Sequence, residues 1–467
     1  MHYEIEYDWL VIVFVHEIVE DITQSRQFVD QIERASHNTN SLVFLVKDTY
    51  LGSDTLPGGE KTFTFMLSLS RLEMKGDGSF RFIPVEGVPI YNPDKHCWET
   101  AFNYIYANFR ARRRMLLTLS HGAGLGINGD AGTVIRPVVS EVITNPYYFL
   151  DRQDVSVLSG PSFTGIDKDS KNDIEKGLIR KDPASVACRS LEILWISELR
   201  DALVRCLGSR PIDLLVMVNC NMQLFDAGFM LSKNVRYLVA PEGSVLAPGY
   251  DYGRLFALIS QDPTTGGSAI AKSIVYDYKE LSCRIGDTFT SLFANSLEPY
   301  PLLLAVFKEF VGLVTADIDR LFPSLFLIRE KKVAYVSIAR NNPSAQSQDL
   351  IDLGQWMRLV ASWCTDISRL ADLYSVFENI LNNEIVQESA VGSGYTDFDR
   401  DFEPKFGYSG LSIYYPLTPT PASRPAAGWC SYFDKKVQDD FRSASGWDIF
   451  LEKYFAIRDT RDKGKKD

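Results

Sequence analysis

Histidine is scarce in this 467-residue chain, which holds only five, and none follows position 121. Any chemistry that needs an imidazole must therefore draw on the N-terminal part of the chain. His121 is the only one of the five that ends an apolar run and leads into a glycine turn. The others lack this setting: His2, His16, His37 and His96.

Clustered cysteines are also missing, although the chain has seven cysteines. No Cys-x-x-Cys pair or Cys/His cluster occurs, which excludes the usual zinc spacings. An odd, scattered set in a large chain does not suggest a disulfide framework, so we expect a reducing compartment. The seven are Cys97, Cys188, Cys206, Cys220, Cys283, Cys364 and Cys430.

Long hydrophobic runs and an excess of positive charge are absent as well. No apolar stretch approaches the roughly 20 residues of a transmembrane helix. The apolar run 9–15 follows three acidic residues and no basic ones, so a signal peptide is not expected. The net charge of −11 argues against nucleic acid or an anionic membrane as the main partner. We therefore expect a cytoplasmic protein that binds neither nucleic acid nor membrane.

Short, continuously apolar runs are what the chain does contain. They have the length and composition of strands that are buried on both faces, as in a parallel sheet. Segments with helical spacing alternate with them, which predicts an α/β fold with a mostly parallel β-sheet flanked by helices. The runs are 9–15, 41–46, 115–119, 214–218 and 237–240, and the helical segments are 25–35, 98–113 and 191–207.

Two segments interrupt this alternation, and the pattern changes after residue 285. Residues 62–86 alternate around a glycine turn, which indicates a hairpin. Residues 151–185 are polar and turn-rich, and a loop of that length is usually functional or disordered. We predict an α/β core over 1–285 and a mainly helical region over 286–467. Its expected helices are 301–314, 349–363, 370–381 and 447–455, with one returning strand at 410–416.

His121 and Cys220 each follow one of the apolar runs. Ligands and catalytic groups gather at the carboxyl ends of strands in open parallel sheets, so the two residues can meet there. A thiolate nucleophile needs an imidazole to handle protons, and glycine N–H groups after the histidine suit an oxyanion hole. Taken singly, a cysteine at the end of a buried strand is more often a small core residue, and a His-Gly turn is more often an ordinary loop; the catalytic interpretation gains equal weight only from their joint placement after two buried strands.

The text around these residues resembles the clostripain family of cysteine endopeptidases, which belongs to the caspase-like clan. That family carries a His-Gly-x-Gly turn and, later, a strand that ends in Asp-Ala-Cys-x-Met with an acidic residue six positions on. The similar segments here are Leu119–Gly124, Val218–Met222 with Asp226, Leu238–Glu242, Pro248–Tyr252, Gly410–Pro416 and Trp447–Leu451. The resemblance covers nearly the whole chain in order.

The resemblance implies a caspase-like fold and hydrolysis of protein or peptide substrates. Cys220 would attack the scissile carbonyl, and His121 would protonate the leaving amine and then activate water. The backbone N–H groups of Gly122 and Cys220 would form the oxyanion hole. No cofactor is required by this chemistry, and dependence on calcium is left open.

One departure from the family concerns the S1 pocket, which binds the P1 residue preceding the scissile bond. The family's aspartate two places before the cysteine, which selects Arg or Lys, is Val218 here. Either another carboxylate replaces it or the P1 preference has changed, because an unpaired buried cation is costly. We expect the substrate-binding residues to include Val218, Asn219, Glu242 and Asp251. Leu125 stands where the family often has Trp.

Two functional alternatives follow. The loop 151–185 lies where the family tends to carry an activation cleavage, but a solvated insertion fits it equally well. Its basic residues are Lys168, Lys171, Lys176, Arg180 and Lys181. The chain could instead be a catalytically silent or partner-activated scaffold that engages a regulatory protein, for instance in bacterial defence.

The basic run Arg110–Arg114 is interpreted as a solvated helix end.

Overall fold

The computed structural model describes most of the chain, and the structural statements below concern these parts alone. The described residues are 6–18, 22–55, 61–86, 97–122, 126–128, 186–189, 193–208, 210–219, 221–243, 249–285, 291–329, 350–391, 409–415 and 440–463. None of the helices within these ranges is both long and apolar enough to cross a membrane.

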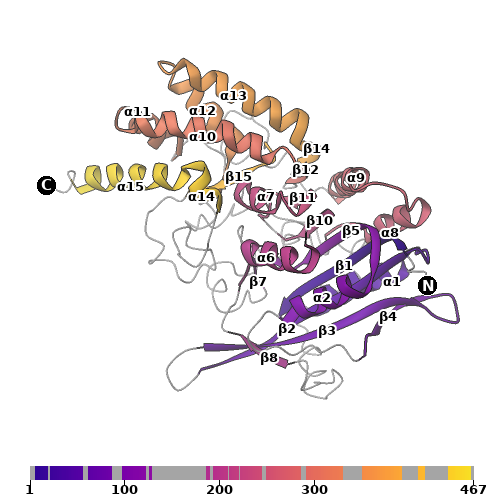
Figure 1. The fold of residues 1–467 in the computed structure, drawn as a ribbon. Coiled ribbons are helices and arrows are strands. Elements are labelled where there is room, and N and C mark those ends of the chain that lie inside the picture. Colours follow the sequence, from indigo (N-terminus) through magenta and orange to yellow (C-terminus); the bar gives the residue numbers. More distant parts are fainter. Residues whose placement is uncertain are drawn as a thin grey trace.

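A ten-stranded mixed sheet forms the centre of the molecule (Figure 1). Its five central strands are parallel and lie in the order β11-β10-β5-β1-β2. They are β1 (Glu6–Ile18), β2 (Ser41–Thr55), β5 (Arg110–Leu119), β10 (Ile212–Val218) and β11 (Val235–Pro241). Each contains one of the five predicted apolar runs, so the parallel core is confirmed.

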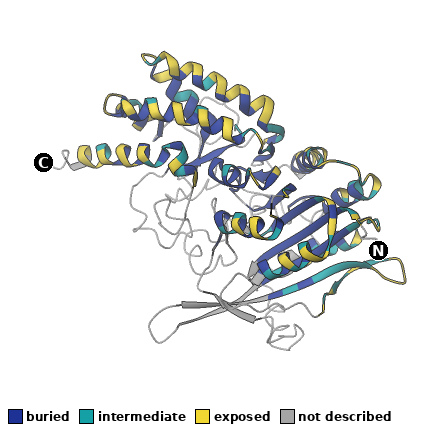
Figure 2. Cartoon of the chain, viewed as in Figure 1, coloured by how far each residue is buried: buried dark blue, intermediate teal, exposed yellow. Residues whose placement is uncertain are grey.

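Both faces of this sheet are covered by helices, and the central strands are buried accordingly (Figure 2). Successive residues of a strand point to opposite faces, so β1 contributes Leu10, Ile12 and Phe14 to one apolar cluster. Its alternate residues, 9, 11, 13 and 15, belong to the other. The first face packs against α2 (Cys97–Asn108) and α6 (Ile196–Leu207). The second packs against α1 (Ile22–Arg34), α8 (Tyr252–Gln261) and α9 (Gly267–Ile285).

Antiparallel strands extend the sheet on both sides. Beyond β2 lie β3 (Lys61–Met74), β4 (Phe80–Pro84) and β8 (Val186–Arg189), and the β3–β4 pair confirms the predicted hairpin. Beyond β11 lie β12 (Ser291–Ser296) and β14 (Val386–Val391). Short strands β6 (His121–Gly122), β7 (Gly126–Asn128) and β9 (Ile193–Trp195) form a separate sheet.

The C-terminal region is mainly helical and lies at the β14 end of the sheet (Figure 1). It shares one apolar cluster with the first face of the sheet, and two of its strands belong to that sheet. Its elements are α10 (Tyr300–Ala316), α11 (Ile318–Leu327), β13 (Leu350–Asp352), α12 (Leu353–Trp363), α13 (Ser368–Ile380), the π-helix η5 (Leu381–Ile385), β15 (Ser412–Tyr414), α14 (Asp440–Ser445) and α15 (Trp447–Lys463). The helix α7 (Phe225–Leu231) joins β10 to β11.

Four sequence expectations were wrong in detail. The region after 285 contains β12, β13 and β14 besides the expected returning strand, and the helix expected from 349 begins only at Leu353, because 350–352 form β13.

The helix expected over 98–113 ends at Asn108, and Arg110–Arg114 forms the first half of β5 instead of a helix end. The difference follows from the parallel pairing of this segment with β1, in which Arg110 stands opposite Glu6 and Arg114 opposite Leu10. Arg112 also lies 3.4 Å from Glu6 and 3.6 Å from Asp8. The helix expected from 191 begins only at Ile196, because 193–195 form β9.

Candidate active site

The strands that precede His121 and Cys220 are direct neighbours. Strands β5 and β10 pair in parallel, and Leu119 stands opposite Val218 in the register. Neighbouring strands lie about 4.8 Å apart, so both chains leave the sheet side by side at its carboxyl edge. The described backbone then pairs His121 with Asn128 and Gly122 with Ile127 in the small sheet. The His121 side chain and Cys220 lie outside the described residues.

Asn219, the residue before Cys220, bridges the two strand ends. Its amide Nδ2 donates to the carbonyl oxygen of Ser120 at 3.0 Å, and its Oδ1 accepts from the Thr118 hydroxyl at 2.5 Å. The Asn219 side chain is fully buried. It therefore ties the residue before the histidine to the residue before the cysteine. Because the site is buried, the loss of either hydrogen bond would leave a polar group without a partner and lower the stability of the fold.

The bridge belongs to a row of polar residues that crosses four adjacent parallel strands. We call Asp48, His16, Thr118 and Asn219 the polar row; all four are buried. His16 Nδ1 lies 2.9 Å from Asp48 Oδ2, and Val15 pairs with Leu119, which places His16 level with Ser120. Sequence reasoning set His16 aside because no glycine turn follows it. The available signal was a polar residue that directly follows an apolar strand.

The segment after Cys220 is held on two sides. Asn221 adopts the left-handed region with φ of 59°, and its N–H donates to the carbonyl oxygen of Gly243 at 2.6 Å. Gln223 N–H donates to Pro241 O at 3.0 Å, and Gln223 O accepts from Ser412 N–H at 3.0 Å. The loop that carries the cysteine is thus fixed between the end of β11 and the C-terminal strand β15.

Val218 packs into the apolar cluster on the second face and is almost fully buried. It lies against the backbone of Gly249, which has φ of +100°. A Cβ placed on Gly249 would stand 2.4 Å from Val218 Cγ1 and 2.6 Å from the Tyr252 hydroxyl. The glycine is therefore required both by its conformation and by the close approach of these side chains. This environment provides no charge at the position where the clostripain family has its aspartate.

The two carboxylates expected near the S1 pocket occupy different environments. Glu242 is fully buried and accepts from Gly410 N–H at 3.1 Å. Burial, together with the neighbouring Asp352, holds the pKa of Glu242 well above its usual range, which makes it a poor partner for a substrate cation. Asp251 is exposed and caps α8, its side chain accepting from Arg254 N–H at 3.0 Å. A contribution of Asp251 to S1 stays a prediction.

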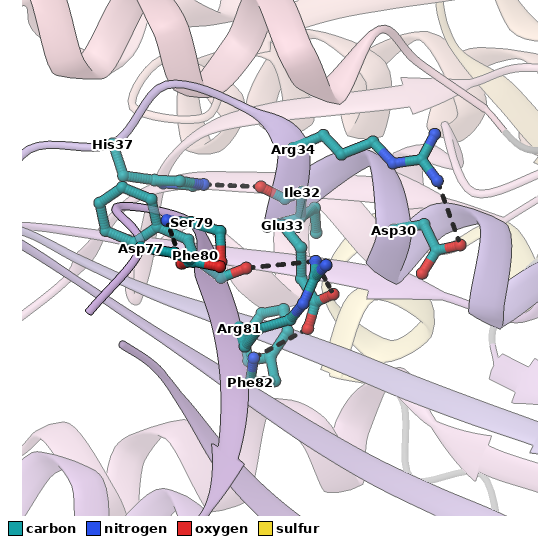
Figure 3. Close-up of polar contacts among 10 residues, drawn as sticks. All are labelled: Asp30, Ile32, Glu33, Arg34, His37, Asp77, Ser79, Phe80, Arg81 and Phe82. Atoms are coloured by element: carbon teal, nitrogen blue, oxygen red, sulfur yellow. Dashed lines mark hydrogen bonds and ion pairs between the residues drawn. The ribbon is translucent and has the colours of Figure 1, made fainter. Parts of the chain in front are cut away.

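His37 lies at the opposite, amino-terminal edge of the sheet, where α1 turns back towards β2. Figure 3 shows it in a polar cluster with Ile32 and the β3–β4 hairpin. Its Nε2 lies 2.6 Å from the carbonyl oxygen of Ile32, and its ring contacts Phe80 and Phe256. Burial lowers the pKa of His37. These contacts indicate a structural role that joins the helix end to the hairpin.

Several further predictions fall outside the described residues. They concern the loop 151–185 with its five basic residues, and Leu125. Within the described ranges, no group of three or more His, Cys, Asp or Glu side chains is placed to hold a metal ion.

Solved structures with the same arrangement are cysteine proteases. An inactive zymogen C11 protease from Parabacteroides distasonis aligns with a TM-score of 0.55 at 15% identity, over 94% of this chain and 98% of that one. A secreted C11 cysteine protease from Bacteroides thetaiotaomicron, in complex with an irreversible peptide inhibitor, aligns with a TM-score of 0.54 at 13% identity, over 94% and 99%. No significant match was found among curated proteins. The fold is thus the caspase-like α/β fold that these protease structures share.

The family model of the clostripain family matches residues 187–454, which is more than half of the chain. The chain therefore belongs to the clostripain family. The matched part includes Cys220 and Glu242, whereas His121 precedes it.

Proposed function

We propose that this clostripain-family protein hydrolyses peptide bonds through a dyad of Cys220 and His121. The observation that carries the proposal is the pairing of Leu119 with Val218, because the two residues follow these strands at one edge of the sheet. A thiolate and an imidazole at adjacent strand ends supply the nucleophile and the proton carrier of acyl transfer. The N–H groups of Gly122 and Cys220 would stabilise the oxyanion.

The environment of Val218 supports a P1 residue other than Arg or Lys. Val218 is apolar and buried, Glu242 has a raised pKa in a fully buried site, and Asp251 caps a helix. A buried substrate cation without a carboxylate partner would pay a large desolvation cost. We therefore expect neutral P1 residues to be cleaved in preference to basic ones, unless Asp251 turns towards the substrate.

Activation by cleavage within 151–185 is part of the same proposal. One similar structure is described as an inactive zymogen. The segment lies between His121 and Cys220. Its basic residues suit a separate protease that selects Lys or Arg, whereas a cut by this protein itself should follow a neutral residue; the basic residues are Lys168, Lys171, Lys176, Arg180 and Lys181. No cofactor takes part in the proposed steps. A chelator titration, with calcium added back, would show whether a cation is needed.

A peptide library tests this function, with Cys220→Ala protein as the control. We expect the wild-type protein to cleave a defined subset of peptides and the variant to cleave none. Activity that survives Cys220→Ala would overturn the assignment of the nucleophile. Intact-mass measurement of both proteins over time would show whether the cut in 151–185 requires Cys220.

A further inference from the structure

A pair of buried carboxyl groups lies directly behind the loop that follows the nucleophile. Glu242 immediately follows β11, between Pro241 and Gly243. The carbonyl oxygens of these two neighbours accept the N–H groups of Gln223 and Asn221, at 3.0 and 2.6 Å. Any displacement of Glu242 therefore moves the two residues that hold the backbone after Cys220.

Asp352 approaches Glu242 from the C-terminal region. It caps α12, with Oδ1 accepting from Gln355 N–H at 2.6 Å and Oδ2 from Ser409 N–H at 2.6 Å. The next N–H along the chain, that of Gly410, donates to Glu242 Oε2 at 3.1 Å. The two carboxyl groups thus bind consecutive N–H groups of one turn. Binding to consecutive N–H groups brings the two carboxyl groups close together, and each acts on the pKa of the other.

Two carboxyl groups can hydrogen-bond only when one of them carries a proton. Both side chains are buried, so two negative charges side by side would be very costly. Asp352 accepts two backbone N–H groups and Glu242 accepts one, so the ionised form suits Asp352 and the proton belongs on Glu242. Within the described part of the chain, Oε1 of Glu242 has no hydrogen-bond partner and is therefore available to carry this proton.

The surroundings of the pair are consistent with a single negative charge. Arg358 of α12 and Tyr374 of α13 both interact electrostatically with Asp352. The Tyr374 hydroxyl donates a hydrogen bond to Glu378. On the side of β12, the Ser291 hydroxyl accepts from Gly243 N–H at 2.8 Å. Asp352 is the only charged side chain that acts on Glu242 among the described residues.

We propose that Glu242 and Asp352 share one proton and act as positioning residues that lock the nucleophile's loop to the C-terminal region. The lock is completed by Ser412, two residues beyond Gly410, whose N–H donates to Gln223 O at 3.0 Å. This inference rests on the proposed peptidase function. It explains how a helical region outside the parallel sheet contributes to the geometry at Cys220.

The shared proton is tested by stability measurements that need no substrate. The pKa of Glu242 is raised in the folded state, so the unfolded state releases this proton first as pH rises. Wild-type stability is therefore lost as pH rises above the unfolded pKa of about 4.3, by up to about tenfold in the folding constant per pH unit. Glu242→Gln keeps a donor for Asp352 and removes the titration. We expect the variant to gain stability relative to wild type between pH 5 and 8, and a pH-independent difference would overturn the shared proton.

The positioning role is tested by comparing Glu242→Ala with Glu242→Gln at pH 7. The alanine variant loses both hydrogen bonds, and we expect its kcat to fall by about tenfold or more with little change in KM. The glutamine variant should restore kcat to within a few-fold of wild type. Unchanged kcat in Glu242→Ala, or equal losses in both variants, would overturn the role. If Glu242→Ala does not fold, the kcat of Glu242→Gln alone decides.

Failure of the peptidase proposal would look different. In that case the wild-type protein would cleave no peptide, and a thiol-directed peptide inhibitor would not label Cys220. The pH dependence of stability in Glu242→Gln would still report on the shared proton.

Discussion

The side-chain amide of Asn219 donates a hydrogen bond to the carbonyl oxygen of Ser120 at 3.0 Å. These two residues immediately precede Cys220 and His121. The same side chain accepts from Thr118, so one of its polar atoms is bound near the end of β5 and the other to the residue that follows this strand. The residues that directly precede the two proposed catalytic residues are thus joined by one buried side-chain amide.

Replacing Asn219 should uncouple the two strand ends. In Asn219→Ala, Ser120 and Thr118 each lose their partner in a buried site, and we expect a loss of about 1–3 kcal/mol in the free energy of unfolding. We also expect kcat to fall while KM stays near its wild-type value, because the Asn219 side chain is fully buried and bound to Ser120 and Thr118, which differs from the substrate-binding role expected from the sequence. Urea unfolding and steady-state kinetics on the best library peptide measure both effects.

Asn219→Asp and Thr118→Val are the matched controls. The aspartate retains an acceptor for Thr118 but has no donor for Ser120, whereas Thr118→Val removes only the other bond. We expect the larger kinetic defect in Asn219→Asp. Equal defects in the two variants would show that the bridge to Ser120 has no special role.

Val218→Asp should lower the folding stability and increase cleavage after basic P1 residues. The side chain is buried against Gly249, so an unpaired carboxylate there should lower stability by several kcal/mol. We expect cleavage after Arg or Lys to rise relative to cleavage after neutral residues. The asparagine of Val218→Asn has nearly the same shape as the aspartate of Val218→Asp but carries no charge, so it should not shift the P1 preference towards Arg or Lys. A preference for basic P1 residues in the wild-type protein would contradict our account of S1.

The His16–Asp48 pair should contribute to stability. Asp48→Ala removes an acceptor 2.9 Å from His16 Nδ1 in a fully buried site, and a loss of about 1–3 kcal/mol is expected. Asp48→Asn keeps an acceptor and should lose less. Thermal and urea unfolding of the two variants provide the comparison, and equal stability of Asp48→Ala and wild type would contradict it.

His37 should make stability fall under mildly acidic conditions. Burial lowers its pKa in the folded state, so the unfolded state binds the proton first as pH falls below about 6.5. Stability conferred by neutral His37 is thus present above that pH and is lost on acidification towards the folded pKa. The slope is below about 1.4 kcal/mol per pH unit, because the ring is partly solvated. We expect His37→Gln to show a shallower decline between pH 6.5 and 5 in urea unfolding; an identical decline would exclude His37 as its source.

The parallel core of the fold could be predicted because each of its strands is a continuous apolar run. The boundary of α2 could not, because Arg110–Arg114 has the composition of a helix end and becomes a strand only in its pairing with β1. The end of α2 depends on contacts between segments that are far apart in the sequence, whereas the core strands are marked by their own composition.

The candidate site was predictable to the same extent. Strand-end position and local motifs predict His121 and Cys220 as candidates, but they do not show that Asn219 bridges to Ser120. Similarly, His16 lacks a motif, and its place in the polar row follows only from the register of β1 with β5. Glu242 was expected among the residues that bind the substrate. Its burial against Asp352 depends on a turn at 409–410 that a single sequence does not place.

The reactivity of Cys220 is the most direct test of the central claim. Wild-type and His121→Ala proteins would be treated with iodoacetamide at pH 7, and labelling of all seven cysteines would be followed by peptide mass spectrometry. Our account predicts that Cys220 of the wild-type protein, after processing of 151–185 if that is required, is labelled far faster than the other six. It also predicts that this excess rate disappears in His121→Ala. Uniformly slow labelling of Cys220, or fast labelling that does not depend on His121, would contradict the proposed dyad.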